Sequence, residues 1–354
     1  MTILHRAVRQ DGKFQNPVPT RVGGFSVIIK IVPLYLTSKE EKEPLEPLGP
    51  FHTDAQVYTA PPKSGLRVTW FGHSSMLLEI DGTRILIDPV WDKRAAPTRW
   101  VGPKRFFAPT LLLEDMPAID AVLVSHDHYD HLGKATVQRL SKLPALAKSQ
   151  WVTSLGVGKL LEKFGVPKQQ ITELDWTQAV SIAGGACEVA SLPARHFSGR
   201  SLFNRFETLW ASFVIKGKDH RVLYGADSGW WEGFAEIGAT YGPFDLTMLE
   251  IGAFNELWKD IHMGPDGAVR AYMALGGLER AGLLMPIHWG LFDLALHGWR
   301  QPMERLLEIA AGREWPLFAP EPGLPTEVAT VRSDWWGRRR TDDRWCSGPR
   351  AASR

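Results

Sequence analysis

The amino-acid sequence predicts a mixed α/β fold, a sandwich of two β-sheets whose outer faces are covered by helices. Short segments rich in β-branched and aromatic residues come first in the body of the chain, and segments with helical periodicity are inserted later. This order is neither a strict alternation of strands and helices nor an all-β pattern. At 354 residues, the chain is long enough to bury a core of this size.

Residues 1–60 are expected to form an N-terminal arm and a linker. The start of the chain lacks the apolar centre and the cleavage site of a signal peptide. The segment FSVIIKIVPLYL (25–36) is too short to span a bilayer and contains Lys30 and Pro33. We expect it to be a strand or helix that packs on the body, and the alternative is shallow contact with a membrane. The Pro- and Glu-rich residues 37–50 then form an extended linker.

The body, residues 61–325, opens with strands. Predicted strands are LRVTWFG (66–72), SMLLEI (75–80) and RILIDPV (84–90), and Asp81–Gly82 is a strong hairpin signal between the last two. A second hairpin joins LWASFVIK (209–216) to RVLYGAD (221–227). Helical periodicity covers 134–143, 154–165 and 264–282.

Charge and cysteine content exclude some classes of protein. The region from Val331 to Arg354 carries seven Arg against three Asp, and the remainder has a formal charge of −2. A near-neutral body without a basic stripe argues against nucleic acid as a partner. Residues 326–354 are expected to be a disordered basic tail, with membrane contact by Trp and Arg as the alternative. Two distant cysteines, Cys187 and Cys346, favour a reducing compartment and a cytoplasmic location.

A dense group of metal-ligating side chains follows the apolar segment 121–124, in VLVSHDHYDHLGK (122–134). His126 and His128 are two residues apart, so a chain that is still extended directs both to the same side. Asp130 and His131 follow where the loop turns, and they can face a second point nearby. Imidazole and carboxylate are the ligands of Zn²⁺ and similar transition metals, and such a cluster would be costly to bury without a metal.

Three further strand ends carry isolated residues of the same kind. Apolar segments stop at His196 (CEVASLPARHFSG), at Asp227 (RVLYGADSG) and at His288 (AGLLMPIHWG). In each case Gly or Ser follows within a few positions. This recurrence predicts that the distant residues complete a site begun by the histidine cluster.

The spacing H-x-H-x-D-H, followed by a single His, a single Asp and a final His, resembles the metallo-β-lactamase superfamily. The resemblance implies an αββα sandwich with two metals at one edge of the sheets. It implies that the first zinc is held by His126, His128 and His196. It implies that the second is held by Asp130, His131 and His288, with Asp227 as the bridge.

Within this superfamily, the chain is similar to the N-acyl-phosphatidylethanolamine-hydrolysing phospholipase D family and its bacterial relatives. The similarity extends from about residue 66 to about residue 307 and includes GPKRF, ITELDW, GPFDLTMLEIGAF and IHWGLFDLAL. Asp127 is a departure, because that family has Asn at this position. The departure removes no ligand but leaves the preference for acyl chain and head group open.

Three other residues have open roles. Asp88 is expected to accept the spare N–H of a ligand histidine, with a turn-initiating role before Pro89 as the alternative. His73 in FGHSS belongs either to the site or to a sheet corner. By the resemblance, His262 lies beside the metals and can give a proton or a hydrogen bond to the substrate; otherwise it only begins a helix. The catalytic candidates are therefore Asp130, Asp227 and His262.

The predicted activity is hydrolysis of a phospholipid or another phosphodiester, in which hydroxide held by two zinc ions attacks phosphorus. Mn²⁺ and Fe²⁺ are alternatives to zinc, because they accept the same ligands. Hydrolysis of a lactone, a lactam or a small phosphodiester is the alternative activity, and a non-catalytic metal-binding protein is a third hypothesis. The loop 91–109, which mixes aromatic and basic residues, either forms its own core or meets an amphipathic substrate. Peripheral membrane contact and a homodimer follow from the resemblance alone.

Overall fold

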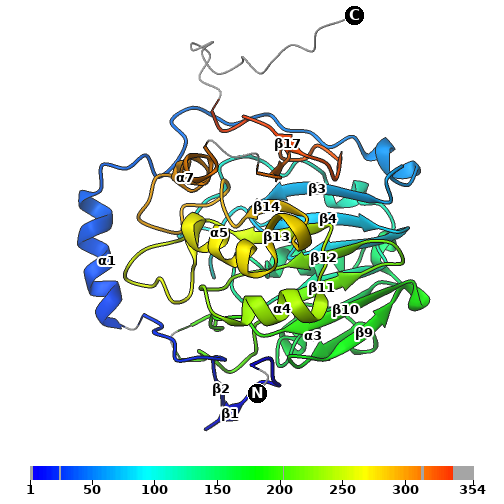
Figure 1. Ribbon diagram of the computed structural model, residues 1–354, viewed down its shortest axis with the longest axis horizontal. Helices are drawn as coiled ribbons and strands as arrows, with labels where there is room; N and C mark the ends of the chain where they lie inside the picture. The colour runs from blue at the N-terminus through cyan, green and yellow to red at the C-terminus, as the bar shows by residue number, and fades with distance from the viewer. Residues whose placement is uncertain (1–2, 24, 202, 312–314, 338–354) are drawn as a thin grey trace, which may run out of the picture.

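The computed structural model describes residues 3–23, 25–201, 203–311 and 315–337. Two β-sheets pack face to face and helices lie on both outer faces, so the predicted αββα sandwich is confirmed (Figure 1). The expectation of a disordered end falls on residues 338–354, which lie outside the described residues.

The first sheet carries the histidine cluster at one end. Among the described residues it has seven strands in the spatial order β16 (Thr326–Glu327), β3 (Leu66–Gly72), β4 (Ser75–Ile80), β5 (Thr83–Ile87), β6 (Ala121–Val124), β7 (Gln150–Ser154) and β8 (Ile171–Leu174). The strands from β16 to β5 are antiparallel, and those from β5 to β8 are parallel. The predicted hairpin at Asp81–Gly82 joins β4 to β5, and both turn residues have positive φ.

The second sheet has the same mixed character. Its six strands, counted over the described ranges, lie in the order β14 (Leu283–Ile287), β13 (Leu246–Glu250), β12 (Arg221–Tyr224), β11 (Ser212–Lys216), β10 (Cys187–Leu192) and β9 (Ala179–Ile182). The first three strands are parallel and the rest antiparallel. Parallel strands end at the same edge of a sheet. The residues that follow β12, β13 and β14 therefore lie close together at this edge.

The helices form two outer layers. They are α2 (Lys134–Leu140) and α3 (Gly158–Lys163) on the first sheet, and α4 (Gly233–Tyr241), α5 (Gly264–Ala274), α6 (Gly277–Arg280) and α7 (Gln301–Ala310) on the side of the second. The single helix predicted over 264–282 is divided, because Gly276 adopts a left-handed backbone with φ of 116° between α5 and α6. A left-handed residue of this kind ends a helix.

Alternation along each strand separates two cores. On β4, Met76 and Leu78 face the second sheet, whereas Leu77 faces α2 and α3. On β5, Ile85 and Leu86 divide in the same way. Successive side chains of a strand point to opposite faces, so one apolar segment supplies both cores. Burial on both faces fixes the register of these strands, and therefore the positions of the residues that follow them.

The helix α1 (Phe25–Thr37) stands to one side of the sandwich (Figure 1, dark blue). It continues through Pro33, and Leu34, Tyr35 and Leu36 near its end are exposed. Its described tie to the body is the Tyr35 hydroxyl, which donates to Asp293 at 2.5 Å. No helix in the described part of the chain is long and apolar enough to cross a membrane.

The boundary expected at residue 325 falls inside the folded body. Strand β16 pairs with β3, and β17 (Val331–Arg332) pairs with β15 (Phe318–Ala319). Trp335 and Trp336 are buried, and the Trp335 ring stacks on Trp289. Six of the seven arginines of the chain end lie at 338–354, and their charge is why the sequence suggested a separate tail from residue 326.

Candidate metal centre

The predicted ligands gather at one edge of the sandwich, each just beyond a strand. His126 and His128 follow β6, Asp227 follows β12, and His288 directly follows β14. His288 has a left-handed backbone with φ of 63°. Such a conformation is rare for a residue with a side chain, and it turns the imidazole back toward the strand ends.

The first group consists of His126, His128, His196 and Asp227, whose ligand atoms lie within 4.8 Å of one another. Nε2 of His126 is 2.9 Å from Nδ1 of His128, and Nε2 of His196 is 3.3 Å from the same atom. The Oδ2 atom of Asp227 lies 3.7 Å from His126 Nε2 and 3.6 Å from His196 Nε2. Three imidazoles and one carboxylate around one point are a donor set suited to zinc.

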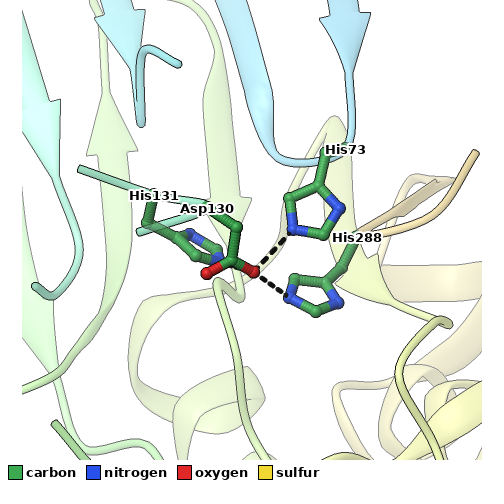
Figure 2. Close-up of side chains that lie close together, drawn as sticks. All are labelled: His73, Asp130, His131 and His288. Atoms are coloured by element: carbon green, nitrogen blue, oxygen red, sulfur yellow. Dashed lines mark hydrogen bonds and ion pairs between the residues drawn. The ribbon is translucent and has the colours of Figure 1, made fainter. Parts of the chain in front are cut away.

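The second group consists of His73, Asp130, His131 and His288 (Figure 2). Oδ2 of Asp130 lies 2.9 Å from His73 Nε2 and 3.3 Å from His288 Nε2, and Figure 2 shows both imidazoles turned toward this carboxylate. His73 occupies the turn between β3 and β4, with φ of 55°. The structure therefore brings His73 into the site, although the sequence left its place open.

Asp227 lies between the two groups. Its Oδ1 atom is 3.2 Å from Nε2 of His131, and its Oδ2 atom is 3.0 Å from Nε2 of His288. Both of these histidines belong to the second group, while the same carboxylate contacts the histidines of the first. One side chain thus reaches both groups.

The pKa values of the histidines in the site are shifted in opposite directions. Burial lowers the pKa of His126 and of His196 well below the usual value. Burial also acts on His288, but Asp227 and Asp130 outweigh it and raise the pKa of His288 to about 10. The buried carboxylates thus require positive charge beside them, which protons or a metal ion can supply.

The arrangement of the donor atoms suits a metal ion better than it suits hydrogen bonds among them. Nε2 of His131, Nε2 of His288 and Oδ1 of Asp227 are buried and have no hydrogen bond of acceptable geometry among the described residues. Buried polar atoms are normally hydrogen-bonded, and a cluster of exceptions calls for another partner. A cation between the two groups would satisfy all three atoms at once.

Asp88 lies behind the second group. Its Oδ2 atom accepts a hydrogen bond from Nδ1 of His131 at 2.7 Å and others from the hydroxyls of Ser125 and Tyr224. Asp88 is fully buried and has a left-handed backbone. Its carboxylate thereby fixes the ring of His131 with Nε2 directed at Asp227.

His262 borders both groups from the loop before α5. Its ring centroid lies 5.0 Å from that of His196 and 5.1 Å from that of His288. Nδ1 of His262 donates to Glu250 at 2.6 Å. Glu250 was not foreseen, because a carboxylate that closes an apolar strand looks like an ordinary strand end in the sequence.

Asp127, within the histidine motif, is not one of the residues that form these groups. Its Oδ1 atom accepts a hydrogen bond from the amide of Gly199, and its carbonyl oxygen accepts one from Arg200. The residue therefore joins the motif to the loop after His196.

This fold, with two adjoining donor groups at the sheet edge, defines a metal-dependent hydrolase. Residues 83–289 match the family model described as Beta-lactamase superfamily domain, and the chain belongs to this superfamily. The predicted resemblance is confirmed.

Relatives agree with this assignment. N-acyl-phosphatidylethanolamine-hydrolyzing phospholipase D 1 of Caenorhabditis elegans is 34% identical over 326 residues, which cover 87% of this chain and 89% of that protein. An uncharacterized protein of Mycobacterium tuberculosis is 48% identical over 276 residues, 77% of this chain and 72% of its own. The isothiocyanate hydrolase from Delia radicum gut bacteria shares the fold with a TM-score of 0.59 at 19% identity, over 75% of this chain and 100% of that one.

Proposed function

We propose that the protein is a dinuclear zinc phosphodiesterase that cleaves N-acyl-phosphatidylethanolamine or a closely similar phospholipid. The observation that carries the dinuclear centre is the position of Asp227, whose two oxygens reach both donor groups. The substrate class is supported by the nematode phospholipase, which is similar over most of both chains.

The first ion would be held by His126, His128 and His196, and the second by Asp130, His131 and His288, with Asp227 shared. When bound, two such ions lower the pKa of water to about 7 and withdraw charge from a phosphate. The same donors accept Mn²⁺ or Fe²⁺.

The protein itself would orient these donors and serve the leaving group. Asp88 holds His131 through Nδ1, which fixes the tautomer that leaves Nε2 as a ligand. His73 contacts Asp130 and restricts the rotation of this carboxylate. His262 lies beside both groups, and a proton or hydrogen bond from its ring would assist the departing alcohol.

A lipid substrate requires the site to approach a membrane, and exposed apolar side chains lie on three segments tied to the ligands. The loop holding Trp100 and Val101 (72% and 75% exposed) bonds to the chain just after His288, through the amide of Phe106 and the carbonyl of Leu291. Phe203, 90% exposed, is in the loop after His196. Leu36 on α1 is 78% exposed, and the adjacent Tyr35 binds Asp293. These side chains would enter the interfacial layer of a bilayer.

Metal content and lipid hydrolysis should be measured together on the wild type and on Asp130→Ala. We expect about two zinc ions per chain, with release of phosphatidic acid from N-acyl-phosphatidylethanolamine by the wild type. Asp130→Ala should lose metal and activity. Asp127→Asn is the matched control, because its amide oxygen can still accept the Gly199 hydrogen bond.

Two metals without lipid cleavage would contradict the substrate and leave the centre intact. Lactones, lactams and small phosphodiesters would then be the substrates to try. Equal loss of metal in Asp127→Asn and Asp130→Ala would contradict the assignment of the ligands.

A further inference from the structure

Glu250 is a buried carboxylate at the site edge that the proposed metal ligands do not include. It is the last residue of β13, the strand between β12 and β14 in the second sheet. Its side chain is 0% exposed. The strands on either side lead to Asp227 and His288, so the carboxylate lies beside the metal centre without belonging to the two main groups.

Two of the three hydrogen bonds that Glu250 accepts in the described structure come from the adjacent residues His262 and Met263. The Oε1 atom accepts hydrogen bonds from the amides of Met263 at 2.9 Å and Ser228 at 3.3 Å. The Oε2 atom accepts one from Nδ1 of His262 at 2.6 Å, and Nδ1 of His288 lies 3.9 Å away. A buried carboxylate needs donors of this kind, because a charge is costly to bury without partners. The contacts therefore hold His262 and the backbone beside it in one arrangement.

The opposite edge of the His262 ring, which carries Nε2, is available to contact a substrate. Among the described residues, Nε2 of His262 has no hydrogen bond, and the side chain is 12% exposed. The ring lines a cavity of about 540 Å³ together with Phe254, Asn255 and Leu296. One side of the imidazole thus faces the histidines of the metal centre, and the other faces a space large enough for a leaving group.

We propose that Glu250 is a positioning residue, which holds the His262 imidazole by Nδ1 so that Nε2 meets the oxygen of the departing alcohol. The inference rests on the proposed phosphodiesterase function and deepens it. As water adds its oxygen to phosphorus, the bond from phosphorus to the alcohol oxygen breaks, and both electrons remain on that oxygen. His262 supplies its proton from Nε2 and regains one from solvent, and the proton lost by the attacking water also passes to solvent. Fixing the ring in advance removes the entropy cost of orienting it during the reaction.

A different role is open to the same atoms. Asp227, Glu250, His262 and His288 offer ligand atoms within 4.8 Å of one another, which is also the arrangement of a further metal site. A metal ligand and a positioning residue differ in two measurable quantities, the metal content and the dependence of the rate on the leaving group.

The test compares two phosphodiesters with the same phosphatidyl part, one releasing N-acylethanolamine and the other 4-nitrophenol. An alkoxide needs a proton to depart, whereas nitrophenolate leaves without one. His262→Ala should lower kcat for the first substrate about 10²-fold, and Glu250→Gln about 10-fold. Both variants should change kcat for the second less than about threefold, keep KM nearly unchanged and retain the metal content of the wild type. In a His262→Ala background, Glu250→Gln should have no further effect.

Asp127→Asn is the control, because it alters another buried acid of the same edge that has no contact with His262. Glu250→Asp keeps the charge and serves if Glu250→Gln does not fold. Equal loss on both substrates, or loss of metal in the Glu250 variants, would overturn the proposal. If the wild type cleaves neither lipid, the proposed substrate fails, and the comparison proceeds with dialkyl and alkyl 4-nitrophenyl phosphates.

Discussion

The two ends of the sandwich differ in how the polar groups of their turns are hydrogen-bonded. At the end far from the ligands, Asp81 in the β4–β5 turn accepts the amides of Asp219 and His220 and Nδ1 of His220 from the β11–β12 turn. Polar groups there satisfy one another across the two sheets. At the ligand end, His131 and His288 carry buried atoms without hydrogen bonds in the described structure.

The backbone shows the same contrast. Positive φ falls on Asp81 and Gly82 at the far end, where Gly and Asp adopt it at low cost. At the ligand end it also falls on His73 and His288, which adopt it less readily than Gly. Strain of this kind persists where the surrounding structure enforces it, commonly at functional sites. One end of the molecule is therefore organised for stability and the other for binding.

The largest effect should follow removal of a ligand at the binding end. We expect His288→Ala to lower the rate at least about 10³-fold on any substrate, because metal catalysis contributes several kcal/mol to the barrier. Metal analysis should show a loss of bound ion, while far-ultraviolet circular dichroism remains that of a folded protein. Full activity with reduced metal content would show that the centre is structural.

A smaller effect should come from the carboxylate behind the ligands. Asp88→Asn should weaken metal binding about 10- to 100-fold, as outer hydrogen-bond partners of ligands commonly do. Competition with a chelator measures this constant. Tyr224→Phe is the control, since it removes one hydrogen bond to Asp88 and keeps the carboxylate. An equal effect of both variants would assign the change to packing instead.

The exposed apolar residues allow the two ends to be compared at a membrane. Leu36→Asp should reduce binding to phospholipid vesicles about tenfold, the equivalent of one leucine side chain kept in water. Leu278 on α6 is 64% exposed at the far end, and Leu278→Asp should leave vesicle binding unchanged. Cosedimentation measures both. Similar losses in the two variants would contradict the assigned orientation.

At the far end, Asp81→Asn should lower the free energy of unfolding by about 1–3 kcal/mol, because it weakens hydrogen bonds to a charged acceptor. Urea titration measures the change. Metal content and kcat should stay at wild-type values. A change in either would mean that the two ends are coupled.

The smallest effect should be the contribution of Asp81 to acid stability. Burial raises the pKa of this carboxyl, but the hydrogen bonds from His220 and from the amide of Asp219 outweigh it, so the pKa is lowered overall. The unfolded carboxyl titrates near about 3.9, so the unfolded state binds more protons below this pH. The stabilisation is complete above about pH 4 and is lost as pH falls further. The difference in stability between wild type and Asp81→Asn should therefore shrink as pH falls below about 4.

Much of the binding end could be predicted from the sequence, because strands buried on both faces stop at ligand-type residues. The pattern located His196, Asp227 and His288 without any knowledge of their neighbours in space. The role of Glu250 could not be predicted, because it depends on a contact with His262. This contact forms only when the loop before α5 folds back. His73 stayed open for the same reason, since its partner Asp130 is 57 residues away.

The chain ends were harder to predict than the body. Residues 326–337 are followed by an arginine-rich sequence and resemble part of a tail, yet Trp335 and Trp336 reach the core. A tryptophan is buried only where the folded body has a space that fits its ring. The shape of the body cannot be predicted from composition. Segment 25–36 was predicted as a strand or helix on the body, and it forms a helix whose Leu36 is exposed.

The pairing of β16 with β3 has a consequence for how the protein is made. About 250 residues must be synthesised after β3 before its partner exists, which takes roughly 10 to 50 seconds at about 5–20 residues per second. Once His288 and Trp289 have been made, the nascent chain contains all the proposed ligands, while the edge of β3 and the ring of Trp289 still lack their final covering. An unpaired strand edge is a place where chains associate wrongly. Protection by a chaperone during translation would therefore matter most in the interval between residues 72 and 336.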